Sequence, residues 1–132
     1  LKELDQVVTK IYHELEEQEL QPVQPSRIAV PTAEGIELLE METILFIKAE
    51  SNYTIFYLRG GKQLTLGKTL KYFQERMPIS FVRVHQSYLV NTQHIKKYLR
   101  KDGGSLLLEA EHVLPVSKSH KDEVKGLLER LM

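Results

Sequence analysis

The 132-residue chain predicts a mainly β domain with short helices, preceded by a separate N-terminal helix. From residue 27 onward, short apolar runs with strand-like periodicity alternate with turns that contain glycine. A stretch with two prolines, QPVQPS at 21–26, precedes this pattern. Because proline favours extended backbone in the residue before it, we place a hinge here. The chain is thereby divided into a linker, residues 1–26, and a domain, residues 27–132.

Residues 1–20 are expected to form the linker helix. The apolar side chains follow a spacing of three and four residues, at Leu1, Leu4, Val8, Ile11 and Leu15. This stripe spans only about two heptads, whereas a coiled coil is indicated by three or four. We therefore interpret the segment as an inter-domain linker rather than a dimerisation helix.

The domain is expected to be built from short paired strands. In chain order these are RIAVP (27–31), EGIELLEME (34–42), ETILFIKAE (42–50), YTIFYL (53–58), KQLTL (62–66), FVRVH (81–85), SYLVN (87–91), IKKYLRK (95–101), SLLLEAE (105–111) and HVLPVS (112–117). Three connections predict hairpins, at Thr32-Ala33, Gly60-Gly61 and Asp102-Gly103-Gly104. The branched apolar residues of 42–50 indicate a buried strand.

Two short helices complete the domain. In the first, within 66–78, Thr69 is the expected N-cap and Pro78 the stop, and the apolar face contains Leu70, Phe73 and Met77. The second lies at the C-terminus, with Ser119 as N-cap and Asp122 completing a capping box. Its expected apolar face consists of Val124, Leu127, Leu128 and Leu131.

Charge is distributed unevenly along the chain. Residues 1–42 carry 3 Lys/Arg against 10 Asp/Glu, net −7, whereas residues 43–132 carry 15 against 8, net +7. The stretch 81–101 contains no acid and five basic residues: Arg83, Lys96, Lys97, Arg100 and Lys101. Such separation suggests a polyanionic partner, although a solvated basic face would give the same pattern.

Catalytic and metal-binding classes are disfavoured. The chain lacks a phosphate-binding glycine loop, a GxSxG elbow and an HExxH pair. It has no cysteine, and its five histidines are not spaced as ligands, so we expect neither a metal nor another cofactor. No apolar run approaches the length of about 18 residues that a membrane span needs, and we expect a cytoplasmic, non-enzymatic protein.

Polar residues interrupt the expected strands in FVRVHQSYLVN, residues 81–91. Gln can bond adenine bidentately, Arg can bond guanine, and His and Ser commonly hold phosphates. Arg83, His85, Gln86 and Ser87 are therefore candidate nucleic-acid contacts. Alternatively, Arg83 and His85 are ordinary exposed strand residues, while Ser87 and Asn91 satisfy local backbone groups.

Three segments together resemble a known family. ILFIKAESNYTIFYL, TLKYFQERMPISFVRVHQSYLVNTQHIKKY and LPVSKSHKDEVKGLL are similar to the LytTR-type DNA-binding domain, over about residues 27–130. The resemblance implies an elongated arrangement of small antiparallel sheets with short helices. It also implies a bacterial transcription regulator whose loops and strand ends, rather than a helix, enter the DNA grooves.

The resemblance implies contacts from three places. They are Asn52 and Tyr53 before one strand, His85, Gln86 and Ser87 between two others, and Lys118 before the last helix. To these we add the basic residues Arg83, Lys96 and Lys97. Many relatives have Arg in place of Gln86 and of Lys118. Gln86 is expected to favour adenine over guanine, and Lys118 to act as a point charge without the arginine fork.

The resemblance also implies partners. These are promoter duplex DNA, usually as paired direct repeats bound by a homodimer, a receiver domain N-terminal to this fragment, and a sensor histidine kinase acting through a phosphorelay. The absent initial Met agrees with removal of a receiver domain. Two alternatives stay open: a β-rich protein-interaction domain that dimerises through residues 1–20, and an RNA-binding domain.

Overall fold

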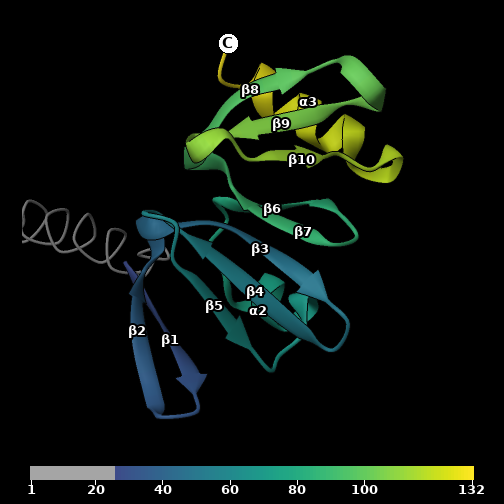
Figure 1. Cartoon of the computed structure of the whole chain (residues 1–132). Coiled ribbons are helices and arrows are strands. Elements are labelled where there is room, and N and C mark those ends of the chain that lie inside the picture. Colours follow the sequence, from purple (N-terminus) through teal and green to yellow (C-terminus); the bar gives the residue numbers. More distant parts are fainter. Residues whose placement is uncertain (1–25) are drawn as a thin grey trace, which may run out of the picture.

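Residues 26–132 are described by the computed structural model of this chain, apart from the side chain of Asp102. The linker helix expected over 1–20, and all but the last residue of the hinge, lie outside the described residues. The described part contains a hairpin, a central sheet and a small third sheet, stacked into the elongated molecule of Figure 1. The predicted fold, small antiparallel sheets with short helices, is confirmed.

The central sheet has five antiparallel strands. In sheet order they are β5 (Gln63–Leu66), β4 (Tyr53–Leu58), β3 (Ile44–Glu50), β7 (Tyr88–Asn91) and β6 (Phe81–His85). Three of the four pairings join strands that are consecutive in the chain. The fourth joins β3 to β7, strands separated by α2 (Leu70–Arg76), and it brings two distant hairpins together.

The other elements cover the two faces of this sheet. The hairpin consists of β1 (Arg27–Thr32) and β2 (Gly35–Glu40), and the third sheet of β8 (Ile95–Leu99), β9 (Ser105–Leu108) and β10 (Val113–Pro115). The chain then ends in α3 (Lys121–Glu129). The short 3-10 turns are η1 (Met41–Thr43), η2 (Thr92–His94), η3 (Lys101–Gly103), η4 (Glu109–Glu111) and η5 (Lys118–His120).

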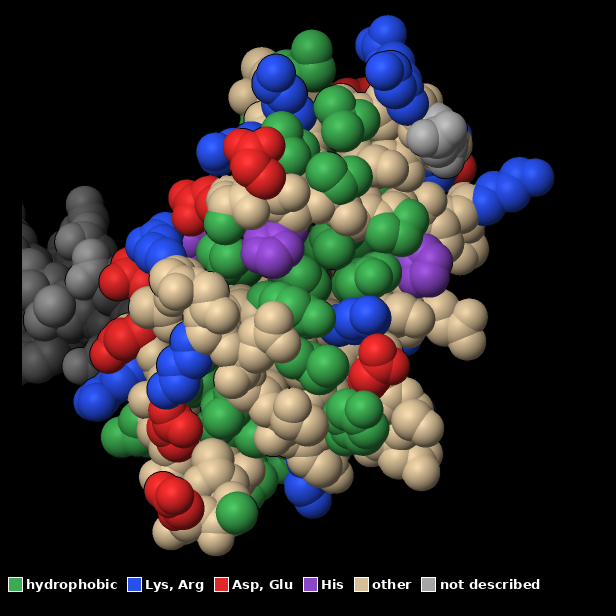
Figure 2. Space-filling view, viewed as in Figure 1, with side chains coloured by type: hydrophobic (Ala, Val, Ile, Leu, Met, Phe, Trp, Pro, Cys, Tyr) green, Lys and Arg blue, Asp and Glu red, His purple; other side chains and the backbone are tan. Residues whose placement is uncertain are grey.

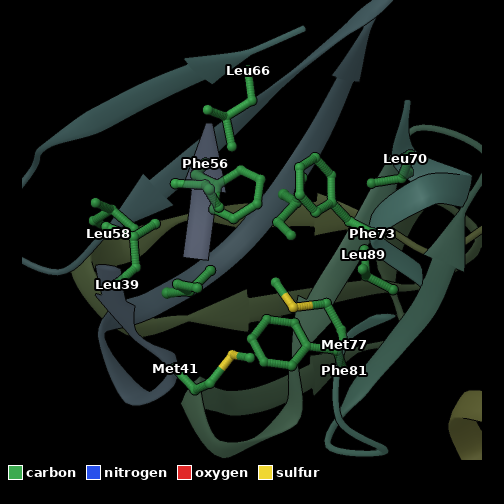
Figure 3. Packing of buried hydrophobic residues seen from close by; sticks show 13 residues of the cluster. Leu39, Met41, Phe56, Leu58, Leu66, Leu70, Phe73, Met77, Phe81 and Leu89 are labelled. Atoms are coloured by element: carbon green, nitrogen blue, oxygen red, sulfur yellow. The ribbon is translucent and has the colours of Figure 1, made fainter. Parts of the chain in front are cut away.

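One face of the central sheet packs against α2 and the β1–β2 hairpin. Phe56 of β4 and Phe73 of α2 meet edge to face, with ring centroids 4.8 Å apart (Figure 3). Around this pair lie Val30, Leu39, Met41, Ile44, Ile47, Leu58, Leu66, Leu70, Met77, Phe81 and Leu89. The helix prediction is confirmed, because Thr69 accepts a hydrogen bond from the Tyr72 amide at 3.2 Å and caps α2.

The opposite face packs against the third sheet and α3. Its buried residues are Leu45, Phe46, Val84, Val90, Leu106, Leu108, Leu114, Val116 and Val124. Leu45 and Phe46 both face this side because the β3–β4 register shifts between Ile44 and Phe46, as at a β-bulge. With these elements on its two faces, the central sheet reaches solvent at the turns between its strands and along the edge strand β5, where Gln63 and Thr65 are exposed.

The C-terminal helix differs from the prediction at both ends. It begins at Lys121, not after Ser119, because residues 118–120 form η5 and the Ser117 hydroxyl bonds His120 Nδ1 at 2.6 Å. It ends at Glu129, so Leu131 is 78% exposed and does not extend the buried stripe. Within the described residues no helix has the length and apolar character needed to cross a membrane.

Candidate nucleic-acid interface

Two turns of the central sheet lie side by side at one end. Residues Ser51 and Asn52 connect β3 to β4, where Glu50 pairs with Tyr53. The neighbouring turn connects β6 to β7. Its Ser87 carbonyl accepts a hydrogen bond from the Ala49 amide of β3 at 2.7 Å. This bond fixes the second turn beside the first, although they are more than 30 residues apart in the chain.

A third segment joins them from the opposite face. The Ser117 amide donates to the Val84 carbonyl of β6 at 2.9 Å, so Lys118 and the rest of η5 lie next to the end of β6. We call this part of the molecule the three-turn end, consisting of residues 51–53, 85–88 and 117–120. It is on the right in Figure 1. The structure thus brings together the three places that sequence reasoning selected separately.

Side chains at the three-turn end remain open to solvent. Asn52, Gln86 and Lys118 are exposed, and Tyr53 is 40% exposed. Among the described residues, no hydrogen bond is made by the side-chain amides of Asn52 or Gln86. Each amide can therefore offer one donor and one acceptor to the same partner, which is the pattern that matches the edge of adenine.

His85 is held in one orientation. The Ser87 amide donates to His85 Nδ1 at 3.0 Å, and the ring lies 5.5 Å from that of Tyr88 between centroids. Because Nδ1 accepts, the hydrogen of the neutral ring resides on Nε2. The part-exposed His85 can therefore donate a hydrogen bond from Nε2, for example to a phosphate oxygen.

Arg83 differs from the other predicted residues. It is half-buried in β6, and burial lowers the pKa of its guanidinium. Its donors reach groups of the chain itself: Nε donates to the His85 carbonyl at 2.8 Å, and Nη1 donates to Gln74 Oε1 at 2.7 Å. Nη2 donates to the Gln86 carbonyl. All three guanidinium nitrogens of this half-buried side chain therefore donate to groups of the chain itself beside the three-turn end.

Lys96 and Lys97 lie elsewhere. They are exposed on β8, which begins just after the other end of β7, where Ile95 pairs with Leu108. The turn between β8 and β9, which carries Arg100 and Lys101, is on the side of the three-turn end (Figure 1). In the basic stretch 96–101, Lys96 and Lys97 thus lie on β8 itself, whereas Arg100 and Lys101 lie in the turn that follows it.

Sequence reasoning did not select Lys48. It lies on β3 opposite Tyr88, with its Nζ 3.4 Å from Glu50 Oε1. The Tyr88 phenol, followed by the Glu50 carboxylate, raises the pKa of Lys48, so the ammonium stays charged at neutral pH. The sequence feature that could have identified it is a lysine two residues before the end of an apolar strand.

Acidic side chains are more numerous on the side of the molecule away from the three turns, although Glu50, Asp122 and Glu123 adjoin these turns. In Figure 2, drawn from the direction of Figure 1, most red side chains lie on the left side of the molecule, where blue ones accompany them. Ion pairs found there include Arg59–Glu109 at 3.2 Å and Lys62–Glu37 at 3.2 Å. Within the three-turn end Lys118 is the one side chain of a Lys, Arg, Asp or Glu, and the adjoining charged residues are of both signs: Lys48, Glu50, Arg83, Lys121, Asp122 and Glu123.

The LytTr DNA-binding domain is the family whose model matches this chain, over residues 34–129. The chain belongs to this family. The matched range contains all three turns of the three-turn end. The family assignment made from sequence motifs is therefore confirmed, and the candidate interface lies wholly within the LytTr domain.

Curated relatives are named as regulatory or sensory transduction proteins. The chain is 30% identical over 110 residues to the positive alginate biosynthesis regulatory protein of Pseudomonas aeruginosa, covering 80% of this chain and 44% of the relative. It is 27% identical over 105 residues to the sensory transduction protein LytT of Bacillus subtilis, covering 77% and 43%. The chain thus spans less than half the length of these relatives.

A solved structure supports the fold. The LytTr DNA-binding domain of a protein described as a methyl-accepting/DNA response regulator from Bacillus cereus superposes with a TM-score of 0.69. The alignment covers 79% of this chain and 97% of the other at 24% sequence identity. At this identity the likeness establishes that both chains share the LytTr fold.

Proposed function

We propose that this LytTr domain binds double-stranded DNA in a sequence-specific way through its three-turn end, as the DNA-binding part of a bacterial transcription regulator. One observation carries the proposal. Three segments distant in the sequence meet at one end of the central sheet, and their polar side chains are exposed there. Membership of the LytTr family supports the same function.

The residues at this end divide into two groups by chemistry. Asn52 and Gln86 carry free side-chain amides suited to base edges in the major groove, with a preference for adenine. Tyr53, His85, Ser87, Lys118 and Lys48 carry donors or charge suited to phosphates, which set the position of the protein without reading sequence. Lys96 and Lys97 would reach only DNA that extends along β8, and this is the weakest part of the predicted contact set.

The proposal extends to the whole protein. We infer a phosphorelay response regulator in which a receiver domain, phosphorylated by a sensor histidine kinase, precedes this domain. Two copies bound to paired direct repeats would then gain affinity through effective concentration, without any new base contact. The name of the Bacillus subtilis relative, a sensory transduction protein, supports this reading.

Selection of bound duplexes from a random DNA pool tests the function, followed by fluorescence anisotropy on the enriched sequence across salt concentrations. We expect a short enriched motif and an affinity that falls by about 0.9 log units per log unit of salt for each phosphate neutralised. Competition with duplex RNA should be weak, because A-form RNA hides its major groove. No enrichment, with binding that vanishes at moderate salt, would contradict sequence-specific recognition.

A second candidate function is a protein contact through the outer face of the β1–β2 hairpin. Ile36 is 77% exposed and Leu38 is 57% exposed, and they pair across the hairpin with exposed Pro31 and Ala29. Replacing both Ile36 and Leu38 with Ser should leave DNA binding unchanged if the three-turn end is the DNA interface. Loss of DNA binding in that folded variant would favour a role for the hairpin.

A further inference from the structure

Arg83 connects α2 to the turn that carries Gln86. Its guanidinium donates from Nε to the His85 carbonyl at 2.8 Å and from Nη2 to the Gln86 carbonyl. The third donor, Nη1, bonds Gln74 Oε1 of α2 at 2.7 Å. One planar group therefore holds two consecutive carbonyls of the turn and is itself held from the helix.

The ladder between β6 and β7 does not supply these bonds. Its register shifts between Arg83, which pairs with Leu89, and His85, which pairs with Tyr88. At such an irregularity, backbone groups of the bulged strand lose their ladder partners. The guanidinium supplies charged donors to the carbonyls at this place, and its rigid fork fits two acceptors where a lysine ammonium would offer a point charge.

Other bonds fix the remainder of the turn. The Ser87 amide donates to His85 Nδ1 at 3.0 Å, and the Ser87 carbonyl accepts from the Ala49 amide at 2.7 Å. The backbone around Gln86 is thus held from β3, from His85 and from Arg83. The side chain of Gln86, in contrast, is exposed. Because the backbone of the turn is fixed, the side-chain amide of Gln86 is presented in one direction, and less conformational entropy is lost on binding.

We propose that Arg83 is a positioning residue for base recognition by Gln86, set in place by Gln74, and that it does not contact DNA. The inference rests on the proposed function and goes beyond it, because it assigns α2 a part in sequence discrimination. It also replaces the expectation, drawn from the hydrogen-bonding capacity and the charge of an arginine in FVRVHQSYLVN, that Arg83 is a direct contact. A guanidinium that turned outward to a phosphate would leave two carbonyls of the turn without their donor.

The test compares Arg83→Lys and Arg83→Gln in the 132-residue chain, with DNA affinity measured on the enriched duplex and on a scrambled duplex. For both variants we expect about a tenfold loss on the enriched duplex, as when the competent turn is populated about one time in ten. Affinity for the scrambled duplex should change by less than about twofold, and the salt slope should stay the same, because no phosphate contact is removed.

Gln74 gives an independent variant that does not disturb β6. Gln74→Ala removes the acceptor for Nη1 and should reduce discrimination between the two duplexes in the same direction, to a smaller extent. Gln74→Glu keeps an acceptor at that position and should retain discrimination. Arg76→Lys is the matched control, since Arg76 is an exposed arginine of the same helix that stacks 3.6 Å from the Tyr72 ring centroid.

A measurement without DNA separates positioning from contact. In Arg83→Lys, amide hydrogen exchange at Ser87 should accelerate in the free protein, because the bond from that amide to His85 depends on an ordered turn. Unchanged exchange at Ser87 would overturn the inference. A second outcome would also overturn it: Arg83→Lys discriminates normally between the two duplexes, and Arg83→Gln lowers the salt slope by about 0.9. This pair of results is the behaviour of a phosphate contact.

The two proposals fail in different ways. If the unsubstituted chain shows no preference for the enriched duplex, the proposed function fails and the inference fails with it. If the unsubstituted chain discriminates and the Arg83 variants discriminate equally well, only the inference fails. Thermal unfolding is measured for each variant, so that a loss of DNA affinity caused by unfolding can be recognised.

Discussion

The two ends of the central sheet use the same residue types in opposite ways. At the three-turn end, Asn52 is exposed and its side chain is open to solvent. At the other end, Asn91 is 1% exposed, and its side chain makes three hydrogen bonds. Nδ2 donates to the carbonyls of Met41 at 3.3 Å and Ile44 at 3.0 Å, and Oδ1 accepts from the Gln93 amide at 3.1 Å.

The histidines form a second matched pair. His85 has one ring nitrogen bonded within its turn and the other free to donate outward. His94 is 3% exposed, and its Nε2 bonds the Glu42 carbonyl at 2.5 Å, while Nδ1 lies 3.2 Å from Glu109 Oε2 and 3.3 Å from Arg59 Nη2. We call the end that contains Arg59, Asn91, His94 and Glu109 the anchored end.

This contrast shows how a small domain divides its polar residues. The anchored end joins the central sheet to the third sheet, and buried polar groups there need partners within the chain. At the three-turn end the side chains of Asn52, Gln86 and Lys118 are exposed, so these polar groups can meet a ligand. Residue type alone does not decide whether a polar side chain bonds within the chain or faces solvent. The burial of the surrounding backbone decides it.

The largest expected effect is on folding, at the anchored end. Asn91→Ala should lower the free energy of unfolding by about 3 kcal/mol, because it leaves buried carbonyls and an amide without a partner. Urea denaturation measures this loss. Asn52→Ala is the matched control and should change stability by less than about 0.5 kcal/mol. Equal losses in the two variants would remove the distinction between the ends.

The next effect is on DNA affinity, at the three-turn end. Gln86→Ala should weaken binding to the best site by about 1–3 kcal/mol and relax specificity at one base pair. Anisotropy on single-base variants of the enriched duplex tests this. Gln93→Ala, an exposed glutamine of the anchored end, should bind normally. A loss in Gln86→Ala that is the same on every sequence would make Gln86 a backbone contact.

A smaller effect concerns the lysines. Lys118→Ala should reduce the slope of log affinity against log salt by about 0.9, the value for one phosphate. The double variant Lys96→Ala and Lys97→Ala should leave the slope unchanged, because both residues lie on β8 of the third sheet and not on one of the three turns. A reduced slope in the double variant would restore these lysines to the interface expected from sequence and would indicate that DNA follows β8.

The smallest expected effect is on acid stability. Burial acts to raise the pKa of Glu109, but hydrogen bonds and charge from His94 and Arg59 outweigh it and lower that pKa. A lowered folded-state pKa stabilises the fold above the unfolded value of about 4.3, and the contribution is lost as pH falls toward the folded value. In Glu109→Gln the free energy of unfolding should therefore decrease less steeply below about pH 5 than in the unsubstituted chain. Glu34→Gln, at the hairpin tip, is the control and should decrease as the unsubstituted chain does; urea denaturation across pH measures both.

The local elements were predictable from the sequence because their signals are local. The Gly60-Gly61 turn has φ of 88° and 84°, the left-handed backbone that favours glycine, and it connects β4 to β5 as expected. The error at α3 has a local cause as well. Ser119 resembled an N-cap, but a hydrogen bond between Ser117 and His120 tightens the chain into η5 before the helix starts.

The site was predictable only in parts. The three segments were recognisable by family resemblance, but their meeting depends on the pairing of β3 with β7 and on one bond from Ser117 to Val84. No periodicity predicts either contact. The role proposed for Arg83 depends on a register shift in β6 and on a glutamine of α2, whereas the sequence shows only an arginine able to bond a base or a phosphate.

The covering of the central sheet on both faces has a consequence for how such a domain can diverge. Its apolar strands are constrained by two cores, whereas Asn52, Gln86 and Lys118 lie on separate turns that contribute little to either core. Under the proposed function, a substitution in one of these turns would alter one DNA contact while the contacts of the other turns persist. Target sites would then change stepwise across descendants, with each intermediate still folded and still able to bind DNA.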